Sequence, residues 1–336
     1  DFPYIASWAE TGQYNGGMVP WHWHPAVELF YMYSGSLVYE TPQGTRTFGP
    51  GSGGLVNANV LHSTRNLPGD RVVSWIHLFE PSLLGGSVGY TGAPVLCAAA
   101  AERSGCGLVF LGVPESVWPA AAVKCWGAMP HPLAEQDGRL SPDAEEEIRR
   151  RAAGCDAVAI GCGVGRGEES DLLLHRLLTV EKPLVLDADG INALEGHIDT
   201  LSRRPCATVL TPHDGELARI GGDMAAPREA SAAAFAAAYG VYLVRKGHRT
   251  LAAAPDGRLA VNTTGNDGMA KGGSGDILTG LLTGLLAQGM EPFAACCAAV
   301  WLHGRAGDLA AEEKGRRGMT PLDIIEMLPY ALKEVE

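Results

Sequence analysis

One glycine-rich segment places a carboxylate beside groups that bind anions. Residues 262–276 read NTTGNDGMAKGGSGD and lead into a long apolar run. Glycines let backbone N–H groups converge on an anion, and a helix N-terminus adds positive partial charge. Asp276 is then expected in the first helical turn, where it could act as a general base for a hydroxyl that attacks a bound phosphoryl group. The alternative is an N-capping aspartate after a flexible turn.

Polar residues also follow three apolar, strand-like runs. Residues 186–192 read LDADGIN, residues 211–217 read TPHDGEL, and residues 246–250 read KGHRT. Ligands bind outside the carboxyl ends of the strands in open α/β sheets, so these segments are expected at one site. His213 and Glu216 are three residues apart, which predicts one shared helix face. Caps and turns are the alternative explanation for each segment taken alone.

A second glycine-rich loop, GCGVGRG at residues 161–167, follows another apolar run. It is not a Walker A loop, because the G-x-x-x-x-G-K-[ST] pattern is absent from the chain. It is not a dinucleotide fingerprint either, because Arg166 stands where the last glycine of that motif belongs. We therefore expect a loop whose backbone approaches a ligand closely.

The elements that must position these residues alternate between strands and helices after residue 85. The sequence predicts strands at 107–112, 157–161, 184–187, 208–210, 241–245 and 250–253, and helices at 144–153, 169–179, 230–238 and 276–288. This alternation is typical of a doubly wound, mostly parallel α/β sheet.

The first 84 residues have a different composition. They hold more than half of the Trp, Tyr and Phe residues and no Cys or Lys, in short runs between Gly and Pro. These runs predict a small all-β barrel fragment. His22, His24 and Glu28 would share one face of an extended strand, and His62 on a later strand would complete a candidate metal site.

Two domains, 1–84 and 85–336, are therefore predicted in this chain of 336 residues. The formal net charge of -12 argues against electrostatic binding of nucleic acid or of an anionic membrane. The eight cysteines form no C-x-x-C pair, which predicts buried free thiols and a cytoplasmic location. We recognise no signal peptide, and the longest apolar stretch, 277–290, is too short to span a bilayer.

Together the motifs after residue 85 resemble the ADP-dependent NAD(P)H-hydrate dehydratases, a branch of the ribokinase-like fold. The resemblance rests on GGSVGYTGAP at 85–94, SGCGLV at 104–109, the three strand-end segments and the segment that ends in Asp276. It covers nearly all of residues 85–336. It implies repair of NADH or NADPH that has added water at the nicotinamide ring. ADP would phosphorylate the ring hydroxyl, and loss of phosphate would restore the dihydropyridine.

The resemblance also implies roles for individual residues. Asp276 would be the catalytic acid/base. The hydrated dinucleotide, NADHX or NADPHX, would contact Ala93, Gly163, His213 and Asp276. The adenine nucleotide and the transferred phosphoryl group would contact Lys246, Gly247, His248, Arg249, Thr250, Gly272, Gly273, Ser274 and Gly275. Glu216 would orient Mg²⁺ through water, and a homo-oligomer is expected.

The N-terminal part resembles the effector-binding cupin of AraC-type transcription regulators. The resemblance rests on Gly16, on HWHPAVE at 22–28, on Gly35 and on LHST at 61–64. In that group the His/Glu set is often structural or contacts an effector, so both readings stay open beside metal binding. No pair of helix-turn-helix units follows, so transcriptional control is not expected.

The junction of the two parts departs from both families. Relatives of the α/β part carry a strand before the Gly-Gly-Ser turn, whereas residues 75–84 precede it here. We expect residues 71–79 to be either the last strand of the cupin or a substitute first strand of the α/β sheet. Two other functions stay open: an ATP-dependent kinase for a vitamin or sugar hydroxyl, and a non-catalytic effector-binding module.

Overall fold

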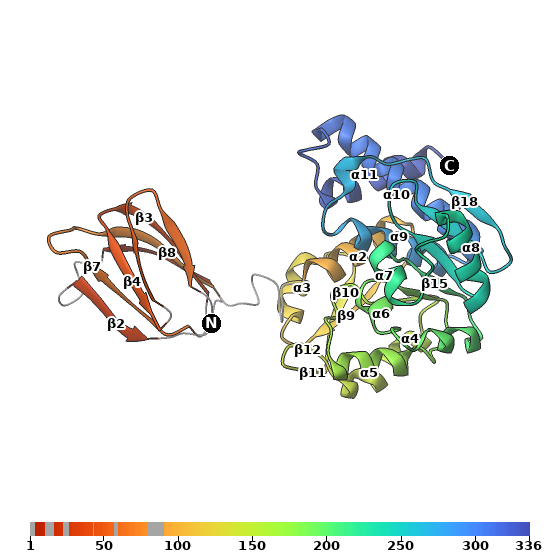
Figure 1. The fold of residues 1–336 in the computed structure, drawn as a ribbon, viewed down its shortest axis with the longest axis horizontal. Coiled ribbons are helices and arrows are strands. Elements are labelled where there is room, and N and C mark those ends of the chain that lie inside the picture. Colours follow the sequence, from red (N-terminus) through yellow and green to blue (C-terminus); the bar gives the residue numbers. More distant parts are fainter. Residues whose placement is uncertain (1–3, 11–16, 23–26, 43, 57–59, 80–90) are drawn as a thin grey trace. The chain divides into compact units, whose positions relative to one another are not determined.

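The structure is a computed structural model, and it describes residues 4–10, 17–22, 27–42, 44–56, 60–79 and 91–336 (Figure 1). The chain divides into two compact units, Asp1–Gly86 and Ser87–Glu336. No helix in the described ranges is long and apolar enough to cross a membrane.

The N-terminal unit consists of two antiparallel four-stranded sheets, in the orders β1-β8-β3-β6 and β2-β7-β4-β5. Its core lies between them and includes Phe30, Met32, Leu37 and Tyr39. The predicted all-β architecture is confirmed. The strands are β1 (Tyr4–Glu10), β2 (Met18–His22), β3 (Val27–Ser34), β4 (Leu37–Thr41), β5 (Gly44–Phe48), β6 (Gly53–Val56), β7 (His62–Asn66) and β8 (Val73–Phe79).

Strand β8 decides between the two expectations for residues 71–79. It pairs with β1 along one edge and with β3 along the other. A strand with both edges paired has no backbone groups left to join a second sheet. The role as substitute first strand of the α/β sheet is therefore wrong, and β8 is the last strand of the N-terminal unit.

The C-terminal unit is built on a six-stranded sheet in the order β13-β14-β15-β16-β17-β18. Strands β13 to β16 pair in parallel, and β17 pairs antiparallel with both β16 and β18, so only β17 runs against the others; the mostly parallel α/β fold is confirmed. The strands are β13 (Val158–Ile160), β14 (Leu184–Leu186), β15 (Thr208–Leu210), β16 (Tyr242–Arg245), β17 (Leu251–Ala253) and β18 (Leu259–Val261). Two smaller sheets pair β9 (Phe110–Pro114) with β10 (Met129–Leu133), and β11 (Glu135–Gln136) with β12 (Arg139–Leu140).

Helices surround this sheet in Figure 1. The α-helices are α2 (Gly92–Arg103), α3 (Trp118–Lys124), α4 (Glu145–Ala153), α5 (Glu168–Leu177), α6 (Asp189–Asn192), α7 (Asp214–Arg219), α8 (Arg228–Tyr239), α9 (Ser274–Ala287), α10 (Pro292–Lys314) and α11 (Pro321–Lys333). Short 3₁₀ helices are η4 (Pro142–Ala144), η5 (Ile198–Arg203) and η6 (Asp267–Met269). Helix α9 begins two residues before the predicted start at 276, because Gly273, at φ +100°, forms its N-cap.

The side chains of the sheet alternate between two cores, as the two-residue period of a strand requires. Val185 and Val209 pack in one core with residues of α9, α10 and α11. Leu186 and Leu210 pack in the other core with residues of α7 and α8. The free cysteines are confirmed, but only Cys296 is buried and the other seven are half-buried, so the expectation of buried thiols is wrong.

Helix α9 lies directly against α2 because it has glycines on the shared face. A Cβ at Gly280 would overlap the backbone carbonyl of Cys97, and a Cβ at Gly284 would overlap the hydroxyl of Ser104. The close approach of the two helices therefore depends on the absence of a Cβ at Gly280 and Gly284.

We predict that Gly280→Ala lowers the free energy of unfolding by about 2 kcal/mol, because overpacking outweighs the better helix propensity of alanine. Gly92→Ala is the control, since a Cβ at Gly92 meets nothing within 4 Å. Urea unfolding of both variants measures the difference. Equal stability of the two would show that the α2–α9 contact tolerates a methyl group.

Candidate active site

The N-terminus of α9 carries the segment that the sequence singled out. Gly273 adopts φ +100°, and a Cβ there would lie 2.6 Å from Leu96 Cδ1. Glycine is therefore required at this turn, for its conformation and for space. Ser274 is buried, and Asp276 falls in the first turn of the helix as predicted. Ser274 N donates to Lys271 O at 3.2 Å, and the N-terminus of the helix, with its positive partial charge, forms an anion-binding end beside a carboxylate.

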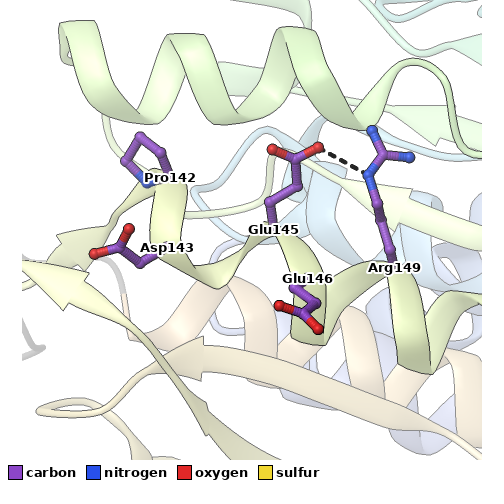
Figure 2. A pocket seen from close by; sticks show the side chains of 5 residues that line it. All are labelled: Pro142, Asp143, Glu145, Glu146 and Arg149. Carbon is purple, nitrogen blue, oxygen red and sulfur yellow. Dashed lines mark hydrogen bonds and ion pairs between the residues drawn. The ribbon is translucent and has the colours of Figure 1, made fainter.

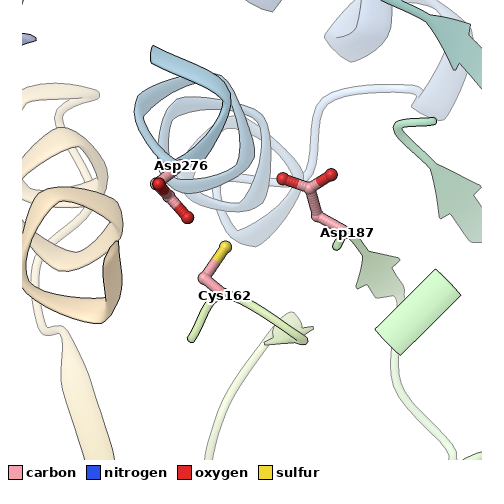
Figure 3. Close-up of side chains that lie close together, drawn as sticks. All are labelled: Cys162, Asp187 and Asp276. Atoms are coloured by element: carbon pink, nitrogen blue, oxygen red, sulfur yellow. The ribbon is translucent and has the colours of Figure 1, made fainter. Parts of the chain in front are cut away.

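Two side chains from other elements lie close to Asp276. The Cys162 thiol, from the loop after β13, and the Asp187 carboxylate, at the end of β14, each have a polar atom within 4.8 Å of Asp276 and of one another (Figure 3). The adjacent parallel strands bring the first two together. Gly161 is needed here, because at φ +126° a Cβ would overlap the carbonyl oxygen of Asp187.

Asp187 is the fixed charge of this cluster. Only 2% of the residue is exposed, and its two oxygens accept different donors. Lys246 Nζ donates to Oδ1 at 2.5 Å, and Thr279 Oγ1 of α9 donates to Oδ2 at 2.8 Å. A buried carboxylate needs such partners to stay ionised.

Lys246 joins this cluster to α7. Its Nζ lies 3.7 Å from Glu216 Oε2, and its backbone N–H donates to Pro212 O at 2.8 Å. Burial lowers the pKa of Lys246, but the charges of Asp187 and Glu216 outweigh it, so the pKa is raised overall. The ammonium group therefore stays charged next to the N-terminal turn of α9. A Cβ at Gly275 would lie 3.4 Å from Nζ, which places this turn beside the charge.

The environment of Asp276 suits proton transfer. Burial raises its pKa above the ordinary aspartate value, and the charge of Asp187 adds to the effect. The nearby Cys162 thiol and the charge of Lys246 act in the opposite direction. A carboxyl whose pKa is shifted toward neutrality by burial can both take and return a proton, as a general acid/base must.

His213 and Glu216 lie together at the start of α7, as their three-residue spacing predicted, and they form its cap. His213 is the N-cap of α7, its Nδ1 accepts from Glu216 N at 3.1 Å, and Glu216 Oε2 accepts from His213 N at 2.8 Å. Lys246 Nζ lies 3.7 Å from Oε2, and His213 Nε2 lies 3.5 Å from Oε1. Both carboxylate oxygens thus have partners, which fits contact with Mg²⁺ through a water molecule better than direct ligation.

The remaining predicted nucleotide residues follow β16 in a tight turn. Gly247 has φ +144° and Arg249 has φ +56°. Arg228 Nη1 donates to His248 O at 2.9 Å, and Thr250 Oγ1 donates to Gly247 O at 3.0 Å. The turn is therefore held by its own chain, while the His248 and Arg249 side chains are exposed.

Other predicted residues lie on the elements that border the cluster. Ala93 is on α2, and Gly163 directly follows Cys162 with φ +74°. Gly272 is exposed and precedes the N-cap of α9. These positions agree with the expected dinucleotide and phosphate contacts, whose roles stay predictions.

Four residues at the site were not predicted as site residues. Asp187 and Cys162 stood in segments that the sequence marked, but their side chains were not assigned. Thr279 lies one turn after Gly275, and it belongs to none of the motifs that the sequence shows. His303 on α10 places Nε2 3.2 Å from Ser274 Oγ. Burial, with the charge of Lys246, lowers its pKa to about 4, so the imidazole is neutral.

The candidate metal residues of the N-terminal unit lie on different strands. His22 ends β2 and Glu28 belongs to β3, in the other sheet, so the expected single extended strand is wrong. Packing of the two sheets brings the groups together instead: His62 Nε2 is 4.0 Å from Glu28 Oε2, and the rings of His22 and His62 are 4.3 Å apart. Tyr39 Oη donates to Glu28 Oε1 at 2.6 Å. His24 lies outside the described residues.

An open hollow of about 400 Å³ lies elsewhere on the C-terminal unit (Figure 2). It is lined by Pro142, Asp143, Glu145, Glu146 and Arg149. Within it Arg149 Nε donates to Glu145 Oε1 at 2.8 Å. Ion pairs four residues apart are common on the surfaces of helices, so this one does not indicate a functional site. None of these residues belongs to the Asp276 cluster.

Two family models match the chain. One, described as NAD(P)H-hydrate dehydratase, matches residues 82–330, and one, described as AraC-like ligand binding domain, matches residues 7–94. Both resemblances predicted from the sequence are confirmed.

Similar proteins carry the same description. A bifunctional NAD(P)H-hydrate repair enzyme of Moorella thermoacetica is 43% identical over 259 residues, which are 75% of this chain and 49% of that enzyme. An ADP-dependent (S)-NAD(P)H-hydrate dehydratase of Neisseria meningitidis is 39% identical over 242 residues, which are 70% of this chain and 78% of that enzyme. The chain spans about half the length of the bifunctional relatives that it matches.

A solved structure agrees with the sequence comparisons. The ADP/ATP-dependent NAD(P)H-hydrate dehydratase of Bacillus subtilis, co-crystallised with ATP and Mg²⁺, has a TM-score of 0.62 and 30% identity to this chain. The match covers 75% of this chain and 87% of that one. With a family match over most of its length and Asp276 in the first turn of α9 as predicted, the chain belongs to the NAD(P)H-hydrate dehydratase family.

Proposed function

We propose that the C-terminal unit dehydrates NADHX or NADPHX in an ADP-dependent reaction. The observation that carries the proposal is the position of Asp276. It stands in the first turn of α9, with a raised pKa, beside the ion pair of Lys246 and Asp187. This arrangement joins an anion-binding helix end, a cation and an acid/base in one place, which is what phosphoryl transfer to a hydroxyl requires.

The reaction then has two stages. Asp276 takes the proton of the ring hydroxyl while the hydroxyl oxygen bonds to the β-phosphorus of ADP and AMP leaves. Departure of inorganic phosphate from the ring and loss of a proton from the neighbouring carbon restore the double bond of NADH or NADPH. The N–H groups of residues 272–275 face the transferred phosphoryl group, and Lys246 offsets its negative charge.

The nucleotide and the hydrated dinucleotide contact different elements of the C-terminal unit. The adenine nucleotide contacts the turn at residues 246–250, and the hydrated dinucleotide contacts Ala93, Gly163 and His213. Mg²⁺, held through water by Glu216, supplies charge neutralisation at the phosphates. The printed description of the Bacillus subtilis structure, with ATP and Mg²⁺, supports this assignment.

The finer properties of the whole chain are part of the same proposal. A cytoplasmic location agrees with the free cysteines. The family resemblance implies a homo-oligomer, which size-exclusion chromatography tests. In the N-terminal unit, the hydrogen bond from Tyr39 to Glu28 favours a structural or effector-contacting His/Glu group over a metal site. Metal analysis of the purified protein tests this assignment.

We predict that Asp276→Asn lowers kcat for NADHX dehydration with ADP by at least about a hundredfold, because amide cannot accept the hydroxyl proton. The return of dihydropyridine absorbance measures the rate. Asp143→Asn, an exposed aspartate in the distant hollow, is the matched control and should keep wild-type activity. A wild-type protein that consumes ATP on another hydroxyl compound and ignores NADHX would contradict the proposal.

We predict that Lys246→Gln raises the Kd for ADP about ten- to a hundredfold, since one charge-assisted contact to phosphate is lost. Glutamine retains a donor for Asp187, which limits the effect on folding. Isothermal titration calorimetry measures the affinity. Lys124→Gln on α3 is the control for the change of net charge, and an unchanged Kd in Lys246→Gln would remove Lys246 from the nucleotide site.

A further inference from the structure

Helix α10 holds the loop that leads into the anion-binding end of α9. This loop, residues 262–273, connects β18 to α9 and contains four glycines. Glycine gives a backbone more accessible conformations than other residues do, so a loop of this kind needs contacts from outside to keep one conformation. The hydrogen bonds of the structure show that α10 supplies such contacts.

Asp308 of α10 binds the loop at two points. Its Oδ2 accepts from Gly265 N at 2.9 Å, and its Oδ1 accepts from Asn266 Nδ2 at 3.0 Å. Hydrogen bonds to a carboxylate are about twice as strong as those between neutral groups. Asn266 Nδ2 also donates to Gly307 O at 2.9 Å, and its Oδ1 accepts from Gly268 N at 3.0 Å. One carboxylate and one amide therefore fix the loop backbone on both sides of Asn266.

The loop also packs directly on the surface of α10. A Cβ at Gly304 would lie 2.2 Å from Thr264 Oγ1, and a Cβ at Gly307 would lie 2.2 Å from Met269 Sδ. Residues three and four apart share one face of a helix, so both glycines lie on the face that carries Asp308. This face of α10 is thus shaped for the loop as well as bonded to it.

The same helix contacts the place where the loop ends and α9 begins. His303 Nε2 lies 3.2 Å from Ser274 Oγ, which is the distance of a hydrogen bond. Ser274 is buried and is the first residue of α9, two residues before Asp276. Helix α10 therefore holds both the middle of the loop and the turn to which the loop leads.

These contacts bear on the reaction because an anion-binding end acts in one geometry only. Donors stabilise a transferred phosphoryl group when their positions are fixed in advance. A misplacement of ~1 Å in the reacting groups can cost about a hundredfold in rate. Residues 272–276 carry both the N–H groups and Asp276, so a loop that moved relative to α10 would displace them together.

We propose that Asp308 and His303 are positioning residues, through which α10 keeps the loop and the first turn of α9 in the geometry that binds the phosphoryl group. The proposal rests on the proposed function, in which this turn receives the phosphoryl group of ADP. Neither side chain contacts the nucleotide in this scheme. Asp308 acts through Gly265 and Asn266, and His303 acts through Ser274.

The first test is the affinity for ADP with Mg²⁺, measured by isothermal titration calorimetry. Asp308→Ala removes both acceptors of the loop, so the Kd should rise about tenfold. Asp308→Asn loses the same charge but keeps an acceptor for Gly265 N, so it should recover much of the affinity. A wild-type Kd in Asp308→Ala would overturn the proposal, as would equal rises in the Ala and Asn variants.

Glu291→Ala is the matched control for this test. Glu291 is the N-cap of the same helix and accepts from Ala294 N at 2.9 Å, so its loss removes one charge and one acceptor of a backbone N–H. It lies about 25 Å from Asp308 along the helix axis. The variant should keep the wild-type Kd, and a rise equal to that of Asp308→Ala would contradict a specific role of Asp308.

The second test concerns His303 and uses a double-mutant cycle. His303→Leu removes the partner of Ser274, so the Kd for ADP should rise about threefold. His303→Gln, whose amide can still bond to the hydroxyl, should lie closer to wild type. In a Ser274→Ala background, His303→Leu should add little, because His303 acts through that hydroxyl. Full additivity, or equal effects of Leu and Gln, would overturn the role of His303.

The third test needs neither ligand nor turnover and separates this proposal from the proposed function. Amide hydrogen exchange in residues 262–276 should be faster in Asp308→Ala than in wild type, while the core strands β14 and β15 exchange as before. Lys271 Nζ also donates to Arg317 O at 3.0 Å, so the loop should loosen without unfolding. Unchanged exchange would overturn the positioning role whether or not the protein dehydrates NADHX. Faster exchange and weaker ADP binding in a protein that leaves NADHX unchanged would support the positioning role, and only the function would be wrong.

Discussion

The buried ion pair of Lys246 and Asp187 is the interaction on which the site depends. It links the ends of β14 and β16, and Thr279 ties the same carboxylate to α9. Removing one partner of such a pair costs about 3–5 kcal/mol, because the other charge is left buried and unpaired. The pair therefore fixes the position of α9 relative to the sheet. The position of α9 in turn determines where the anion-binding turn and Asp276 lie.

The two-residue period of the strands explains why these side chains meet. Val185 faces the core under α9, so Asp187, two residues on, points to the same side. Val244 faces that core as well, so Lys246 follows it toward α9. Arg245 between them points to the other face, where it donates to Asp214 of α7 at 2.7 Å. A register shift of one residue would exchange these partners and separate the cation from Asp187.

How far the sequence alone predicts this arrangement depends on whether a feature is local. The position of Asp276 in a first helical turn and the polar strand ends follow from neighbouring residues, and both are found as predicted. The pairing of His213 with Glu216 is local too, since the two residues are three apart, although its form as a helix cap follows only from where α7 begins. The neutral His303 depends on a contact between segments 29 residues apart, so no spacing rule indicates it. The single strand expected for His22 and Glu28 fails for the same reason. The packing of two sheets, and not the alternation along one strand, brings those groups together.

The charges of the cluster also determine when the acid/base holds a proton. Lys246 neutralises Asp187, so the protonation of Asp276 sets the net charge beside the N-terminus of α9. In the proposed reaction, a phosphoryl group bound at that turn would add negative charge beside Asp276. Like charges favour the protonated carboxyl, so the bound nucleotide would favour transfer of the hydroxyl proton to Asp276. Transfer of the phosphoryl group and gain of the proton would thus reinforce each other, and departure of phosphate would favour the return of Asp276 to its charged form.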